Sequence, residues 1–222
     1  MQVLPRDIFK SIIKEIFNLP VWIKQIIYLE LKQEFESSEI KRYFSAITRD
    51  NCFQLYIPKL TYTGRKEIEK KAGKHSEEIY NILEGAFQEL SIVEIAISNN
   101  WNLHECSKYF LEAMDNDLVA KPTSPALRGT ALYMAGRIRL GEYFVKINKI
   151  NMEQLDEALR NQKYIEDSIG DKPGLADILI DLGFLTKEDT EGILFLKKDC
   201  KKYFKPAITE ENKFFTGAET GK

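Results

Sequence analysis

The sequence contains few histidines and cysteines, two residue types that often build catalytic and metal sites. It has two histidines and three widely spaced cysteines, Cys52, Cys106 and Cys200, with no CxxC pair. Neither His75 nor His104 has a second ligand at the spacing that zinc sites use. The chain also lacks a GxxxxGK[S/T] phosphate-binding loop and a GxSxG nucleophile turn. We therefore predict a non-enzymatic protein with no catalytic residues, no metal site and no cofactor.

Long apolar runs are also missing. None approaches the roughly 20 residues that a membrane-spanning helix needs. Charged residues interrupt the early apolar positions, at Arg6, Asp7, Lys10 and Lys14, so the start of the chain does not resemble a secretion signal. An odd number of scattered cysteines is typical of reduced thiols. We expect a cytoplasmic protein with no membrane span.

The chain has no excess of positive charge. Its 32 Lys and Arg residues face 34 Asp and Glu residues, which gives a net charge of −2. This balance argues against a general binder of nucleic acids or anionic membranes, because both need a clear cationic surface. Only Arg65 to His75 is locally basic, and we interpret that stretch as the solvated face of a helix.

Glycine and proline are scarce, at 12 and 7 residues, while 44% of the chain is hydrophobic. This composition favours a globular, mainly α protein. We predict a helical domain with a winged-helix-like unit over residues 1–124 and a small all-helical domain over residues 125–204. The second domain would hold two helix–cap–helix units, and residues 205–222 would form a flexible tail.

The first 50 residues show helical spacing. Apolar residues recur at i, i+3 and i+4 from Ile8 to Phe17, and Val21 to Phe35 predicts a second amphipathic helix after Pro20. A third helix is expected after Ser37 and Ser38.

One segment favours a strand. Between Cys52 and Leu60 the apolar residues Phe53, Leu55 and Ile57 alternate with other residues, and Pro58 would place the strand at an edge. Gly64 then predicts a turn.

Residues 76–121 resemble a generic winged-helix module. Ser76 and Ser91 each precede a helical pattern, and a turn at residues 101–103 leads into a third helix from His104 to Asp115. Residues 121–129, with two prolines and a glycine, would be the wing or a domain linker, followed by a helix over Thr130 to Ile138.

The third helix of such a module would read DNA, but its sequence is acidic. It carries His104 and Lys108 together with Glu105, Glu112 and Asp115. DNA affinity needs several cations on the reading face. We therefore expect a module that contacts proteins, and DNA binding stays open as the alternative.

The most informative feature is a pattern that recurs after 35 positions, from Arg139 to Gln162 and from Gly174 to Lys197. Each copy has a short apolar run that stops at Asn148 or Gly183, residue types that tolerate the left-handed conformation after a helix. An N-cap follows, Asn151 in the first copy and Thr186 in the second, each with a capping partner three positions on. Both copies therefore predict helix, tight cap and second helix.

The first copy resembles the small N-terminal domain of type II secretion and type IV pilus assembly ATPases, in its spacing of R-L-G, apolar pair, G or N, apolar residue and L-x-x-x-L-x-x-Q. One branch, the MshE N-terminal type, binds cyclic di-GMP through two tandem copies of this motif. The resemblance covers roughly residues 137–202 and implies these ligand contacts: Arg139, Leu140, Gly141, Leu155, Leu159 and Gln162. The matching positions of the second copy are Gly174, Leu175, Ala176, Thr190, Leu194 and Lys197, so that copy lacks both the Arg and the Gln.

Three functions stay open at this point. The first is a bacterial adaptor or regulatory protein that acts through protein contacts, linked by resemblance to secretion, pilus or motility signalling. The second is a cyclic di-GMP receptor that uses residues 139–162, where an Arg fork suits the O6 and N7 edge of guanine and a Gln amide both donates and accepts. The third is a winged-helix DNA-binding regulator. The partner protein itself is not indicated by the sequence.

Overall fold

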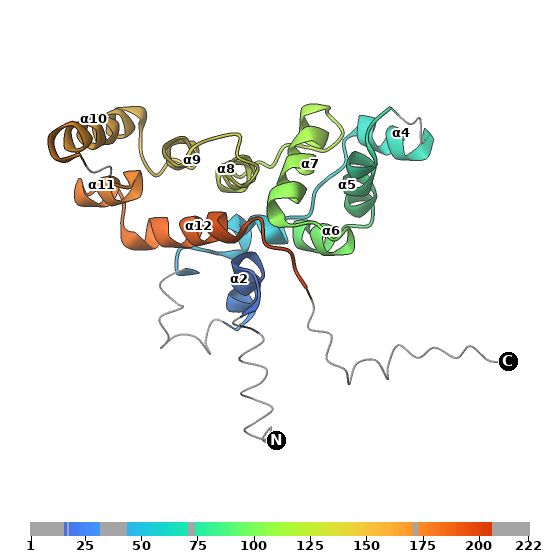
Figure 1. Ribbon diagram of the computed structural model, residues 1–222. Coiled ribbons are helices and arrows are strands. Elements are labelled where there is room, and N and C mark those ends of the chain that lie inside the picture. Colours follow the sequence, from blue (N-terminus) through green and yellow to red (C-terminus); the bar gives the residue numbers. More distant parts are fainter. Residues whose placement is uncertain (1–15, 17, 32–43, 71–73, 171–172, 206–222) are drawn as a thin grey trace, which may run out of the picture.

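The computed structural model describes residues 16, 18–31, 44–70, 74–170 and 173–205. Within these ranges the protein is mainly helical, as the composition predicted, with ten α-helices and two short 3₁₀ helices. Figure 1 shows them arranged along an elongated body, with α4 at one end and α10 at the other. The α-helices are α2 (Val21–Glu30), α4 (Tyr62–Lys70), α5 (Glu77–Phe87), α6 (Ile92–Ser98), α7 (Leu103–Asp115), α8 (Pro125–Met134), α9 (Leu140–Lys146), α10 (Met152–Ile169), α11 (Leu175–Asp181) and α12 (Lys187–Asp199), and the 3₁₀ helices are η2 (Arg49–Asn51) and η3 (Phe53–Leu55).

Local capping signals place most helix starts. Ser91 and Asn102 form capping boxes at the starts of α6 and α7, with Glu94 and Glu105 as the reciprocal partners. Pro20 precedes α2, which begins at Val21 as predicted and ends at Glu30. The predicted helices from Ile8 to Phe17 and after Ser37 lie almost entirely outside the described residues, as does nearly all of the predicted tail.

The predicted strand over Cys52 to Leu60 is wrong. Residues 49–51 and 53–55 form the 3₁₀ helices η2 and η3 instead. The β contact that the described residues contain is a single antiparallel bridge between Leu60 and Val119. Alternating apolar residues fit a strand, but a strand also needs a partner over several residues, and here the pairing ends after one bridge.

The helical trio predicted for residues 76–121 is present as α5, α6 and α7. The described residues hold no β-hairpin to serve as a wing, and residues 125–129 belong to α8. Ser124 caps α8 by accepting a hydrogen bond from the Leu127 N–H, and Pro125 occupies its first turn, where a proline costs no hydrogen bond. The connection from α7 to α8 is therefore formed by residues 116–124, and α8 starts five residues before the predicted Thr130.

The predicted turn at Gly64 is also wrong, because Gly64 lies inside α4. A Cβ at this position would overlap the backbone carbonyl oxygen of Leu118. The glycine is thus required by a close approach between α4 and residues 117–118. The Thr61 hydroxyl fixes this approach by donating to the Asp117 carbonyl oxygen at 2.5 Å.

Helix α12 ties the two predicted domains together. The Cys200 carbonyl at its end accepts a hydrogen bond from the His104 N–H at 2.9 Å, and the Asp199 carboxylate accepts one from the Val21 N–H at 3.3 Å. The Trp22 indole N–H donates to the Lys202 carbonyl at 2.9 Å. One continuous cluster of buried side chains runs from Trp22 to Cys200 and includes residues on both sides of position 124.

Candidate functional site

The two recurring segments, 139–162 and 174–197, adopt the same backbone turn. Asn148 has φ of 60° and Gly183 has φ of 72°, both in the left-handed region that the sequence predicted. The N–H groups of the next two residues bond to one carbonyl in each copy, that of Phe144 in the first and that of Leu179 in the second. Asn151 and Thr186 then cap α10 and α12 through complete capping boxes.

The segments also touch each other. Gly141, in α9, lies so close to Leu155 of α10 that an added Cβ would overlap that side chain, and the same Cβ would lie 3.2 Å from Leu175 of α11. Helices α9, α10 and α11 thus pack around a position where only glycine fits without a shift of neighbouring side chains. Lys149, in the turn between α9 and α10, and Asp189, in the first turn of α12, join the copies through an ion pair of 2.7 Å.

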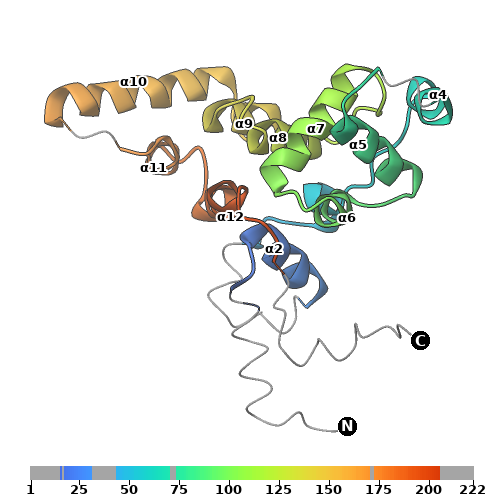
Figure 2. The same ribbon diagram turned by 45° about the vertical axis from the view of Figure 1, so that its right-hand side comes forward.

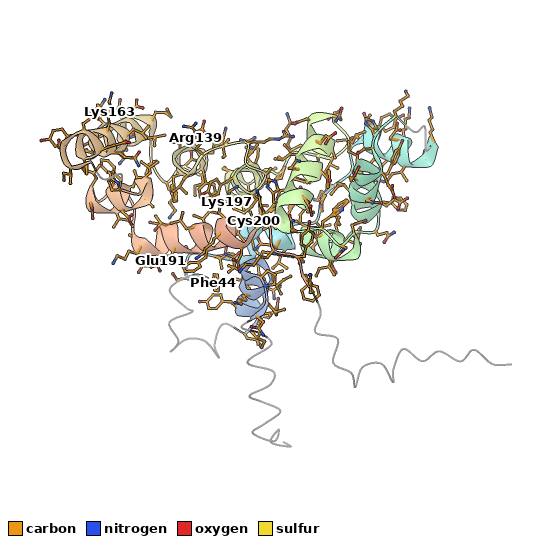
Figure 3. The ribbon with its side chains drawn as sticks, in the orientation of Figure 1. Phe44, Arg139, Lys163, Glu191, Lys197 and Cys200 are labelled. Carbon is orange, nitrogen blue, oxygen red and sulfur yellow. The ribbon has the colours of Figure 1, made fainter. Side chains whose placement is uncertain are left out.

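Arg139, the predicted guanine-binding residue, is the N-cap residue of α9 and is exposed. Its backbone N–H donates to the Glu142 carboxylate at 2.7 Å, which fixes the start of the helix. No ion pair holds its guanidinium among the residues that the structure describes. Figure 3 shows Arg139 at the outer edge of α9, away from Lys197 and Cys200.

The other five predicted ligand residues fall into two groups. Gly141 and Leu155 are buried against each other, and Leu140 is half-buried beside them. Leu159 is 44% exposed on α10, one turn beyond Leu155. Gln162 is half-buried, and its amide donates to the Pro173 carbonyl at 2.7 Å, so part of its hydrogen-bonding capacity is already used within the fold.

In the second copy the matching positions occupy the same environments with different chemistry. Ala176 and Thr190 are buried, like Gly141 and Leu155 in the first copy, and Leu194 is 37% exposed, like Leu159. Lys197 matches Gln162 and also donates to backbone carbonyls, those of Tyr133 and, at 3.2 Å, Met134 at the end of α8. The sequence carries no local signal of this contact, because it joins residues more than 60 positions apart.

Cationic and polar donors gather at the end of α8. The Lys197 ammonium lies 4.8 Å from the centre of the Tyr133 ring, and the His104 imidazole donates through Nδ1 to the Met134 carbonyl at 2.8 Å. Donors at a helix C-terminus satisfy carbonyls that the helix leaves free. Burial lowers the pKa of Lys197, and the Coulombic interaction with Cys200 opposes that effect.

The three thiols are free and buried. Burial raises the pKa of Cys52 to about 11, and it also raises the pKa values of Cys106 and Cys200. Their thiolate forms are therefore disfavoured at neutral pH. In the described parts of the chain, no three His, Cys, Asp or Glu side chains are grouped so that they could hold a metal ion.

Helix α7, the candidate DNA reader, is packed inside the molecule. It buries seven side chains, among them Phe110 and Leu111, and contacts both α5 and α8. On its solvent side, Glu105 accepts a hydrogen bond from the Tyr203 hydroxyl at 2.8 Å, and Asp115 pairs with Arg137. The exposed part of α7 is thus mainly acidic, as the sequence indicated.

A pocket of about 230 Å³ lies between η3, α2, α8, α9 and α12. Its buried amides are partnered: the Gln54 Nε2 donates to the Gln25 Oε1 at 2.5 Å, and Gln25 donates to the Gly192 carbonyl. Tyr143 also lines it, and burial raises the pKa of that phenol to about 12 although Thr130 hydrogen-bonds to it. None of the six predicted ligand residues lines this pocket.

Comparison with known proteins gave no match to a family model, to a curated protein or to a solved structure. The resemblance of residues 137–202 to the secretion-ATPase N-terminal domain therefore stays a prediction from the motif residues. Among the described helices, none has the length and apolar character to cross a membrane.

Proposed function

We propose that this chain is a non-enzymatic adaptor or regulatory protein that acts through protein–protein contacts, with α10 as a docking surface. The observation that carries this proposal is the poor burial of α10. The helix has 18 residues, yet it buries only Leu155 and Ala158. Figure 2 shows its C-terminal end reaching past α11.

The inward stripe of α10 continues beyond the part that the body covers. Leu155, Ala158, Gln162, Ile165 and Ile169 follow one another at helical spacing and so share one face. The first two are buried and Ile165 packs partly against the core, whereas Ile169 is 74% exposed. We interpret this exposed end of the stripe as the surface for another protein.

The occupant that fits is an amphipathic helix of a partner protein. A helix packs on a helix by placing apolar side chains along a shared stripe, and Ile169 at the end of α10 and Leu159 nearer its start are exposed apolar side chains available for such packing. The resemblance of this region to secretion and pilus ATPase domains makes a component of a secretion, pilus or motility system the expected partner.

A pair of variants on α10 tests this proposal. Ile169→Glu places a charge on the exposed stripe, whereas Ser168→Glu places the same charge on the neighbouring exposed position. If the tagged chain is purified from its own cells after mild cross-linking, we expect Ile169→Glu to remove a specific protein that wild type and Ser168→Glu retain. Identical sets of retained proteins for all three chains would contradict docking at α10.

A second candidate, cyclic di-GMP binding, is favoured by the side chains of Arg139 and Leu159. Arg139 has no ion-pair partner in the described structure, and Leu159 leaves an apolar surface exposed. A guanidinium fork and an apolar platform suit the edge and face of guanine. Because Gln162 already bonds to Pro173, Arg139 would provide most of the polar recognition.

Calorimetric titration with cyclic di-GMP distinguishes the two candidates. Arg139→Ala should weaken binding at least tenfold, which corresponds to about 1.4 kcal/mol. Arg160→Ala removes the same charge from an exposed position of α10 and should leave binding unchanged. Absence of heat with the wild-type chain would rule out the receptor and leave the adaptor untouched. DNA binding is not proposed, because α7 is packed and its exposed face is acidic.

A further inference from the structure

A groove lies at the end of the molecule opposite α10. It has a volume of about 620 Å³ and is formed by residues 57–60, by α4 at Arg65, and by the end of α5 with the following turn. Both views place α4 and α5 far from α10, so this groove and the α10 surface are separate.

The walls of the groove are fixed by backbone hydrogen bonds. The Tyr56 carbonyl accepts from the Ile92 N–H at 2.9 Å, and the Lys59 carbonyl accepts from the Ala120 N–H at 2.7 Å. The turn after α5 is closed by a bond from the Leu90 N–H to the Gly85 carbonyl at 2.9 Å. These backbone hydrogen bonds hold the groove in place, so a ligand would bind to a preformed surface.

Two large apolar side chains of the groove face solvent. Phe87 is 64% exposed and Ile57 is 45% exposed, and the buried Pro58 and Ala86 also line the groove. Single exposed apolar residues are common on protein surfaces. Two of them in one concave site indicate a surface that loses solvent when a partner binds.

Basic side chains flank this apolar surface. Lys59 and Arg65 are exposed and line the groove, and neither forms an ion pair within the described part of the chain. Glu89 is the one acidic residue that lines it. The local charge therefore favours an acidic ligand, which it would also orient.

We propose that this groove docks a short segment of a partner protein that carries one or two large apolar side chains next to Asp or Glu. The apolar side chains cover Phe87 and Ile57, and the acidic group pairs with Arg65 and Lys59. This surface is independent of α10, so the two together let one chain hold two different proteins. Binding at this groove does not depend on docking at α10, and the two surfaces are tested by different variants.

Selection from a random peptide library tests this site without a known partner. The full-length chain is immobilised, and the enriched 12-residue peptides are measured by fluorescence anisotropy. We expect peptides rich in Leu, Ile or Phe with flanking Asp or Glu. Phe87→Ser and Arg65→Glu should each weaken their binding at least tenfold.

Two control variants match these changes. Tyr62→Ser removes an exposed aromatic ring of α4 that does not line the groove, and Lys70→Glu reverses an exposed charge of the same helix. Both should bind the selected peptides like the wild type. Failure to enrich any peptide, or enrichment of peptides whose binding ignores Phe87 and Arg65, would overturn the proposal. So would a groove filled by a second copy of the chain, seen as self-association that Phe87→Ser abolishes.

Discussion

The segments 139–162 and 174–197 share a backbone turn and an N-cap but differ in what their side chains do. Both place a left-handed residue after a short helix and an N-cap three positions later. In the first copy Arg139 remains exposed, whereas the second copy has Gly174 at that position. In the second copy Lys197 links α12 to the end of α8 through hydrogen bonds to backbone carbonyls. The capping residues thus determine the helix–turn–helix path in both copies. The other motif positions can differ, and they serve either ligand binding or contacts within the fold.

The largest expected loss of stability comes from truncating the buried residue whose carbonyl accepts the hydrogen bonds of the turn in each copy. Phe144 and Leu179 are both fully buried, and each carbonyl accepts two hydrogen bonds from the turn. Phe144→Ala should lower the free energy of unfolding by about 3–5 kcal/mol and Leu179→Ala by about 2–5 kcal/mol, because each leaves a cavity. Urea unfolding followed by circular dichroism measures both. A loss below about 1 kcal/mol in one copy would show that this copy does not share the common core.

A smaller effect should separate Lys197 from Gln162, its counterpart in the first copy. Lys197→Met removes charge-assisted hydrogen bonds to the end of α8, for which we expect a loss of about 1.5–3 kcal/mol. Gln162→Leu removes one neutral hydrogen bond to Pro173 and should cost about 1 kcal/mol. The same unfolding assay measures both variants. A larger loss for Gln162→Leu than for Lys197→Met would mean that the Lys197 contact does not stabilise the fold more than the Gln162 contact does.

How far the sequence predicted this structure depended on the range of each interaction. The caps at Ser91, Asn151 and Thr186 were predictable because a cap involves residues only three positions apart, whereas Asn102 was expected in a turn and proves to be the N-cap of α7. The role of Gly64 was not, since it depends on Leu118 approaching from another part of the chain.

The same limit applies to the candidate surfaces. The six motif residues could be named from the sequence because their spacing is local, and the structure brings two of them, Gly141 and Leu155, into contact. The groove with Ile57 and Phe87 had no signal in the sequence, because only the tertiary fold places these residues on one concave surface. The alternation that suggested a strand at Cys52 to Leu60 failed for the same reason: pairing partners are set by tertiary structure.

The smallest effect concerns the ion pair that links the copies. Burial raises the pKa of Asp189, but hydrogen bonds from Lys149 and Thr186 outweigh it, so the pKa is lowered overall. A carboxylate with a lowered pKa stabilises the fold above its unfolded-state pKa and loses this contribution as the pH falls through the folded value. Lys149→Met should therefore cost up to about 1 kcal/mol at pH 7, since Lys149 is half exposed.

The pH dependence of that variant is the check. The difference in unfolding free energy between wild type and Lys149→Met should stay constant from neutral pH to about pH 5 and shrink below about pH 4. A difference that does not change with pH would show that the ion pair contributes nothing to the stability of the fold.

The most direct test of the adaptor proposal uses a photo-reactive amino acid placed at Ile169 or at Phe87 in the full chain inside its own cells, with Lys108 as a control position. The proposed function and the second surface together predict a discrete adduct from each of the first two positions, with different partner proteins, and none from Lys108. The absence of adducts from both positions, or the same adducts from all three, would contradict the claim that this chain joins two proteins through its opposite ends.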